Sequence, residues 1–258
     1  MSAAKALIQG FVSRLLPGAF IDDRDDAKPV RMKRYGEINI SEADGSLYGY
    51  SDEGSVLVAT NATIGTGLTG VTAQIVFNDT GPALYIYNSE NAANPNAKSL
   101  YLGYLKMIAT AAATTSTSQH YAGVLDTVYR TITTDNYATI VPVNPNGATA
   151  VSATPIVKFQ NNATVSLIAA SSVAKRIVCR GTLGGLNIVG DEMIISFGRG
   201  DISPHPGLTA VQAAGVSKRV SNAPPVIIGP GQTFTLHLWG LAQAAAYSPE
   251  IELVMWAR

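Results

Sequence analysis

Most of this chain is a succession of short runs rich in β-branched and aromatic residues, separated by Gly, Pro and Asn, from about residue 36 onward. Such runs are typical of β-strands, and no helical spacers lie between them, as βαβ units would require. We therefore predict an all-β domain, an antiparallel β-sandwich, over residues 36–258. The predicted strands are 55–60, 72–78, 83–88, 98–112, 121–132, 138–143, 163–170, 175–183, 191–198, 225–229, 232–242 and 250–257.

The C-terminal third carries the clearest strand pattern. Apolar residues alternate with others along 232–242 and again along 250–257, which predicts one buried face on each strand. Pro230 and Gly231 fit positions i+1 and i+2 of a type II turn, because glycine accepts the positive φ at the second position. A strand, a turn, a strand and a last apolar strand end many jelly-roll domains, so we predict a jelly-roll-like sandwich. The residues of the buried faces are Phe234, Leu236, Leu238, Ile251, Leu253 and Met255.

Residues 1–35 differ in texture and are predicted to form an N-terminal amphipathic helix followed by a charged, extended arm. Apolar residues recur at i, i+1, i+4, i+5, i+8 and i+9 and stop before Pro17, which is one face of a helix that starts near Ser2. The charged stretch 21–37, "IDDRDDAKPVRMKRYGE", is predicted to be solvated or bound to a partner. The residues predicted to dock on a partner are Leu7, Ile8, Phe11, Val12, Leu15, Leu16, Arg31, Lys33 and Arg34.

The charge composition argues against several classes of partner. Eighteen basic residues balance eighteen acidic residues, so no overall field attracts nucleic acid or an anionic membrane. Only 14% of the residues are charged, against about 25% in typical domains, which predicts a surface partly covered by a partner. No run reaches the roughly 18 apolar residues of a transmembrane helix, and Gln9 and Arg14 interrupt any signal-peptide core. We expect a soluble protein that stays in the cytoplasm until it joins a larger assembly.

Residues 65–70, "GTGLTG", match the dinucleotide-binding pattern G-x-G-x-x-G. That site needs a helix directly after the glycines, because the helix N-terminus holds the pyrophosphate. The residues that follow, "VTAQIVFND", are β-branched and short, and the acidic residue expected about 20 positions on falls at Glu90 in a polar stretch. We predict a glycine-rich loop between strands and no cofactor.

Metal binding is also not predicted. His237 could belong to a cupin-like site, but residue 235 is Thr and the other histidines, His120 and His205, lie far away in sequence, so a half-buried strand histidine is the better interpretation. The carboxylates of "DDRDD" (22–26) could bind Ca²⁺, but they lack the Gly and the distal Glu of an EF-hand loop. "KPVRMKR" could touch nucleic acid, but an acidic protein surface is the favoured partner.

No catalytic group stands out, and we predict that the protein is not an enzyme. Cys179 is the single cysteine and is flanked by Val178 and other strand residues, as a core thiol would be. Arg176 and Arg180 nearby leave a reactive thiol as the alternative. Glu250 and Glu252 share a strand face, and we interpret them as charges on a solvated edge strand. No G-x-S-x-G or phosphate-binding loop occurs.

Several segments resemble, in texture and order, a group of virion proteins of tailed bacteriophages that is common among aquatic phages. The similar pieces are "DEGSVLVATNATIGTGLTG", "ALYIYNSENAANPNAKSLYLGYLKMIATAAATT", "RIVCRGTLGGLNIVGDEMIISFG", "PPVIIGPGQTFTLHLWG" and "EIELVMWAR". The resemblance covers about residues 35–258 and implies a β-sandwich on the capsid surface or in the tail, with no catalytic signature. The N-terminal helix and arm are longer than this group leads us to expect.

From this resemblance and the composition we expect a virion structural protein, made in the host cytoplasm, that decorates or cements the capsid. Its expected partners are the major capsid protein or other virion subunits, and its own copies, with a trimer as the first expectation. Three alternatives stay open: a tail, fibre or receptor-binding component with sugar-stacking aromatics near Tyr85, Tyr87 or Tyr101; a jelly-roll major capsid protein; and an enzyme with a cupin-like or glycan-active site.

Overall fold

The structure is a computed structural model of the whole chain, in which the contacts define two units, residues 1–43 and 44–258. In the first unit, β1 (Arg31–Met32) pairs antiparallel with β2 (Ile38–Asn39). The predicted N-terminal helix lies outside the described residues. The structure describes residues 31–32, 38–39, 51, 54–61, 63, 65–68, 74, 76–111, 119–162, 164–170, 175–183, 189–198, 218–240 and 248–258.

The described part of the second unit is built from strands, which confirms the predicted all-β class. Strands predicted from β-branched and aromatic runs occur at β5, β11, β12, β15 and β16, with ends within two residues of the predicted ones. The strands of this unit are β3 (Val56–Thr60), β4 (Leu84–Tyr87), β5 (Leu100–Ala111), β6 (Gln119–Asp126), β7 (Ile132–Thr134), β8 (Tyr137–Ile140), β9 (Ile156–Gln160), β10 (Leu167–Ile168), β11 (Lys175–Leu183), β12 (Glu192–Phe197), β13 (Lys218–Ala223), β14 (Ile227–Ile228), β15 (Thr233–Gly240) and β16 (Ser248–Ala257).

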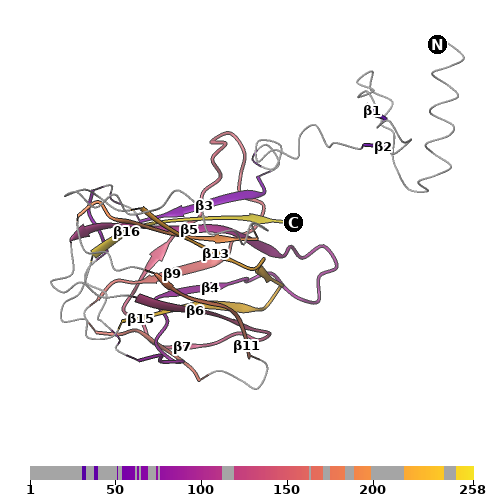
Figure 1. Cartoon of the computed structure of the whole chain (residues 1–258). Coiled ribbons are helices and arrows are strands. Elements are labelled where there is room, and N and C mark those ends of the chain that lie inside the picture. The colour runs from indigo at the N-terminus through magenta and orange to yellow at the C-terminus, as the bar shows by residue number, and fades with distance from the viewer. Residues whose placement is uncertain are drawn as a thin grey trace, which may run out of the picture. The chain divides into compact units, whose positions relative to one another are not determined.

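Two six-stranded sheets contain nearly all of these strands. The first sheet has the order β13-β12-β5-β16-β3, with β14 also paired to β5, and the second has the order β11-β6-β15-β4-β9-β8. Figure 1 shows them as two layers, with β3, β5 and β16 in one and β4, β6 and β15 in the other. Neighbouring strands are antiparallel except β12 and β13, which run parallel. β7 and β10 form a separate two-stranded pair.

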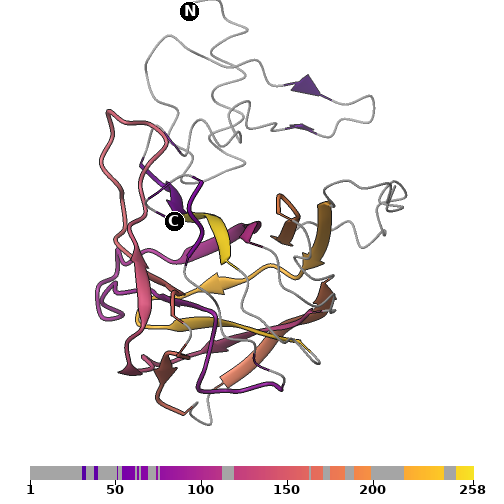
Figure 2. The ribbon, with the colours of Figure 1, turned by 90° about the vertical axis from the view of Figure 1, so that its left-hand side faces the viewer.

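The pairing between strands is nested along the chain. β3 pairs with β16, β4 with β15, β5 with β12, and β6 with β11. Two further pairings, β16 with β5 and β15 with β6, join these couples into the sheets. The C-terminal strand therefore lies beside the first described strand of this unit, which the turned view of Figure 2 also shows.

The core lies between the two sheets and is made by the faces predicted to be apolar. Phe197 on β12 meets Phe234 on β15 edge to face, with ring centroids 6.1 Å apart. The Tyr121 hydroxyl on β6 and the Ser221 hydroxyl on β13 are 2.7 Å apart and hydrogen-bonded, which links the sheets near their common edge. Burial confirms the predicted inward set, which consists of Phe234, Leu236, Leu238, Ile251, Leu253 and Met255.

The predicted turn at Pro230 and Gly231 is also confirmed. Gly231 has φ +73°, and the Gln232 N–H donates to the Gly229 carbonyl at 3.1 Å, which closes the turn. The two strands that it joins do not pair with each other, because β14 belongs to the first sheet and β15 to the second. The turn therefore carries the chain from one layer to the other.

Residues 141–155 form a long connection between β8 and β9 that stands out from the sheets in Figures 1 and 2. Its base covers the outer edge of β3. Val58 and Val143 exchange two backbone hydrogen bonds of 2.8 Å, and the Ser152 N–H donates to the Gly54 carbonyl at 2.9 Å. A loop from the second sheet thus closes one edge of the first sheet.

The predicted and observed strands differ at several places. Residues 74 and 76–78 of the predicted strand 72–78 are not in a strand. The predicted strand 121–132 ends at Asp126, because the chain leaves the sheet before Arg130, whose side chain is buried elsewhere. The predicted strand 163–170 is reduced to β10, Leu167–Ile168. β7, β9 and β13 were not predicted as separate strands; the sequence of β13, "KRVSNA", is polar and has no apolar alternation.

The contact between the sheets predicts a large cost for removing Phe234. We expect Phe234→Ala to lower the free energy of unfolding by about 3–5 kcal/mol, because it leaves a cavity between the layers. Phe77→Ala is the matched control, since Phe77 is 38% exposed, and it is expected to cost only about 1 kcal/mol. Urea unfolding followed by circular dichroism measures both values, and equal losses would contradict this account of the core.

Candidate functional site

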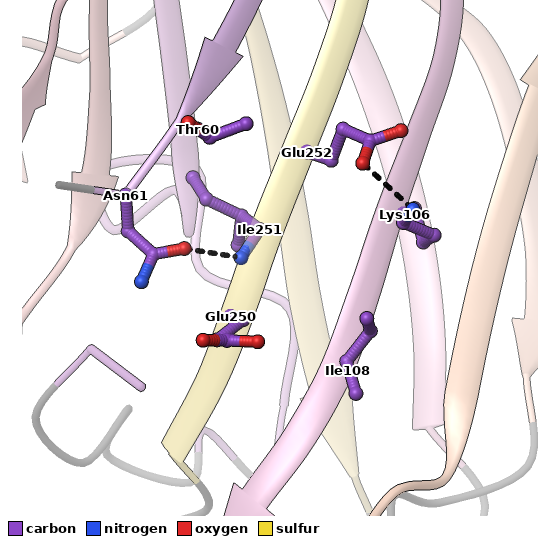
Figure 3. A pocket seen from close by; sticks show the side chains of 7 residues that line it. All are labelled: Thr60, Asn61, Lys106, Ile108, Glu250, Ile251 and Glu252. Atoms are coloured by element: carbon purple, nitrogen blue, oxygen red, sulfur yellow. Dashed lines mark hydrogen bonds and ion pairs between the residues drawn. The ribbon is translucent and has the colours of Figure 1, made fainter. Parts of the chain in front are cut away.

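A pocket of about 240 Å³ opens on the outer face of the first sheet, where β3, β5 and β16 lie side by side (Figure 3). Side chains that face outward on these strands form its floor, and the chain just after β3 forms one side. It is lined by Thr60, Asn61, Lys106, Ile108, Glu250, Ile251 and Glu252.

The charged groups of this pocket are paired with one another. Glu252 Oε2 lies 2.7 Å from Lys106 Nζ, and Glu252 Oε1 accepts a hydrogen bond from the Tyr104 hydroxyl. Burial raises the pKa of Glu252, but the hydrogen bonds from Lys106 and Tyr104 outweigh it and hold this pKa below its ordinary value. Burial and the bond to Glu252 raise the pKa of Tyr104 to about 12. The cluster is therefore an ionised carboxylate with its donors in place.

Glu250 and Glu252 do not lie on an edge strand, which corrects the interpretation from sequence. β16 is a central strand with β3 on one side and β5 on the other. The Glu250 carboxylate accepts a hydrogen bond from the Gly65 N–H, as Glu252 does from Lys106. Each carboxylate thus joins β16 to a neighbouring segment.

The glycine-rich loop lies beside this pocket and connects strands, as predicted. Gly65 has φ +79°. The side-chain amide of Asn61 donates from Nδ2 to the Thr66 carbonyl at 2.9 Å and so bridges the start and the end of the loop. The Leu68 N–H donates to the Pro249 carbonyl at 2.9 Å. Gly67 packs so closely on β5 and β16 that a Cβ there would lie 2.1 Å from Thr110 Oγ1. These contacts fasten the loop to the first sheet.

The centre of the outer face of the second sheet is buried, and His237 lies there beside Tyr85 and Thr235. His237 is 1% exposed rather than half-buried. Its Nδ1 lies 2.9 Å from the Asn78 carbonyl and its Nε2 lies 3.1 Å from Thr235 Oγ1. Because a carbonyl only accepts, Nδ1 carries the proton and Nε2 accepts from the Thr235 hydroxyl. Burial lowers the pKa of His237 to about 4, and the bond to Asn78 offsets part of that effect.

The described histidines do not gather into a metal site. His120 stacks on Trp239, with ring centroids 5.6 Å apart, and its Nδ1 lies 3.1 Å from Thr182 Oγ1. His205 lies outside the described residues. No group of three or more His, Cys, Asp or Glu side chains with metal-binding geometry occurs in the described part of the chain.

Arg130 ties three segments to the outer face of the second sheet. The side chain is 2% exposed. Its Nη2 donates to the Ala169 carbonyl at 2.6 Å and lies 3.2 Å from Asp79 Oδ2, while Nη1 lies 3.5 Å from Asp126 Oδ2. A buried guanidinium is tolerated only when carboxylates and carbonyls surround it. This cluster holds the covering segments in place and was not predicted, because its members are far apart in sequence.

The backbone of the same residue binds the sheet itself. The Arg130 N–H donates to Thr233 Oγ1 at 3.2 Å, and its carbonyl accepts from the Tyr85 hydroxyl at 3.0 Å. Tyr85 is 1% exposed, so it is not one of the exposed aromatics that the receptor-binding alternative requires.

Two aromatic pairs do reach the surface. Tyr101 on β5 and Trp256 on β16 stack almost in parallel, with an interplanar angle of 4° and ring centroids 6.0 Å apart. Tyr87 on β4 contacts Tyr129, with ring centroids 4.5 Å apart. Tyr101, Tyr87 and Trp256 lie on strands rather than in loops.

The predicted core thiol is confirmed. Cys179 is buried on β11, and burial raises the pKa of its thiol to about 11, so the thiolate is disfavoured at neutral pH. Of the residues predicted to dock on a partner, Arg31 lies in β1, opposite Asn39. The others lie outside the described residues: Leu7, Ile8, Phe11, Val12, Leu15, Leu16, Lys33 and Arg34.

Comparisons with protein-family models, with curated proteins and with solved structures each return no match. Among the described residues, no helix has the length and apolar character needed to cross a membrane.

The burial of His237 predicts a loss of stability in mild acid. The unfolded chain binds a proton at His237 below about pH 6.5, whereas the folded protein resists it until about pH 4. The free energy of unfolding should therefore fall by about 3 kcal/mol as the pH drops through this window and be unaffected by His237 above it.

Urea unfolding at several pH values measures this effect. His237→Gln should remove the His237 contribution to the pH dependence, while His120→Gln, on the neighbouring strand and the same face of the sheet, should retain it. The same pH dependence in His237→Gln and in the unaltered protein would show that another group is responsible.

The close packing of the glycine loop predicts that Gly67 does not tolerate a side chain. A Cβ would also lie 2.7 Å from the Ser248 carbonyl oxygen, so Gly67→Ala should lower the free energy of unfolding by about 1–3 kcal/mol. Gly147→Ala is the control, because no atom lies within 4 Å of a Cβ there, and its effect should stay within about 0.5 kcal/mol. Denaturant midpoints of the two variants provide the comparison.

Proposed function

We propose that this protein is a bacteriophage virion structural protein, a capsid decoration or cement protein, and that its β domain is a jelly-roll sandwich. Nested strand pairing is the observation that carries the proposal. Eight strands pair in a nested order: β3 with β16, β4 with β15, β5 with β12 and β6 with β11. This pattern supports a rolled antiparallel ribbon, the jelly-roll arrangement found in viral capsid and lectin domains.

The surface chemistry agrees with a binding role. Fold alone does not assign function, so the chemistry of the polar groups in the pocket must also be considered. The carboxylates of the pocket already accept hydrogen bonds from Lys106, Tyr104 and Gly65, and a carboxylate held by donors in this way is a poor acid or base near neutral pH. We therefore favour a protein that makes contacts over an enzyme.

The proposed partners are the major capsid protein, other virion subunits and further copies of this chain in a cyclic assembly, with a trimer first. The residues 1–35 are the proposed attachment segment. Their apolar positions, Leu7, Phe11 and Leu15 among them, recur with helical spacing and fit a groove on another chain. The resemblance to virion proteins of tailed phages supports the same partners.

A receptor-binding component of the tail is the second candidate. The Tyr101 and Trp256 rings, stacked at 6.0 Å on the outer face of the first sheet, favour it, because aromatic faces combine apolar area with a polar rim. The position of the protein on the particle, measured by cryo-electron microscopy, separates the two candidates. Copies distributed over the capsid shell support decoration, and copies confined to the tail tip contradict it.

The attachment role of the N-terminus predicts a separable loss of binding. Deleting residues 1–20 should leave a β domain with an unchanged circular dichroism spectrum that no longer co-sediments with particles. Leu7→Asp combined with Phe11→Asp should act like the deletion, because a buried carboxylate opposes docking. Gln9→Glu, off the apolar face, is the control and should bind normally. Normal particle binding by the deletion variant would refute the attachment role.

A further inference from the structure

The edge strands β3, β8 and β11 are protected to different degrees. β3 is covered by residues 141–155 through Val58 and Val143, and β8 has only four residues. β11 has nine residues and lies at the end of the second sheet, where no described strand pairs with its other side. Unpaired edge strands of this length bind extended segments from other chains through backbone hydrogen bonds.

The β11 edge combines an apolar surface with basic side chains. An open hollow of about 460 Å³ runs along it, between Ile177, Val178, Cys179 and Arg180 on one side and Pro224 on the other. The Ile177 side chain is 61% exposed, so it presents apolar surface to this hollow.

The charge of this edge is positive. Lys175, Arg176 and Arg180 are exposed along β11. Lys175 lies 3.4 Å from Asp79, whereas no described carboxylate forms a salt bridge with Arg176 or Arg180.

The same charges select the occupant. Two copies of this edge would repel each other, and the bulge between Ile177 and Cys179 also disfavours symmetric pairing. An occupant must therefore be extended and acidic. Residues 20–26 of the chain, "FIDDRDD", are acidic, with four carboxylates, one guanidinium and two apolar residues.

We infer that the β11 edge of one copy binds residues 20–26 of a second copy, which adds a strand to the second sheet. The carboxylates of the segment pair with Arg176 and Arg180, and Phe20 and Ile21 supply apolar surface for the hollow beside Ile177. The interaction joins copies head to tail, as cyclic assemblies require. It does not depend on a virion role, since it involves this chain alone.

Sedimentation velocity on the full chain tests this inference, and no capsid is needed. The unaltered protein should self-associate at roughly micromolar concentration, and its Kd should weaken about tenfold or more between about 0.05 M and 0.5 M salt. Arg176→Glu with Arg180→Glu should weaken the Kd about tenfold or more, and so should Asp23→Lys with Asp25→Lys. Lys98→Glu, a charge reversal away from this edge, is the control and should leave the Kd unchanged.

Mixing provides the decisive measurement. Each charge-reversed variant should stay monomeric alone, while an equimolar mixture should associate, because the carboxylates introduced on β11 of one copy would then face the lysines introduced in the acidic segment of the other. Hydrogen exchange of the β11 amides should slow with rising concentration of the unaltered protein. The inference would be overturned if the unaltered protein were monomeric, if either double variant kept the Kd of the unaltered protein, or if the mixture stayed monomeric. None of these outcomes bears on particle binding.

Discussion

The pairing of the first described strand of the domain with the last is the constraint on which the rest of the structure depends. β16 lies between β3 and β5, so the first sheet is continuous only when the C-terminal strand has been inserted. The pairs inside this outermost one, β4 with β15, β5 with β12 and β6 with β11, repeat the same relation at shorter separations. Such long-range pairing carries a high loop-closure cost, which the core between the layers must offset.

The two outer faces of the sheets then serve different purposes. On the second sheet, covering segments held by Arg130 bury Tyr85 and His237, so this face acts as a second, more polar core. Its ion pairs are costly to bury, and the carbonyl of Ala169 and the carboxylates of Asp79 and Asp126 around the guanidinium offset that cost. On the outer face of the first sheet, the Lys106 and Glu252 pair and the Tyr101 and Trp256 stack are partly exposed.

The edges of the sheets show a similar division. One edge of the first sheet, β3, is closed within the molecule, because Val58 on β3 pairs with Val143 of the 141–155 connection. In contrast, β11 carries basic residues and an exposed Ile177. The proposed attachment segment and the β11 edge, which no described strand pairs on its outer side, would provide two kinds of contact, one with the particle and one with other copies. A module that works by contact needs no convergent catalytic groups, and the pocket carboxylates are engaged in holding strands together.

The sequence by itself determined the all-β class, the positions of β5, β11, β12, β15 and β16, the type II turn at Gly231 and the glycine loop at Gly65. These features are local, because two-residue alternation and turn residues report backbone conformation over a few residues. Only the tertiary structure decided which strands pair, that Glu252 meets Lys106, and that the segments held by Arg130 cover His237. Those contacts join residues far apart in the chain. The pattern of a strand specifies which of its faces is apolar, but it does not specify which strand lies beside it or which segment covers its other face.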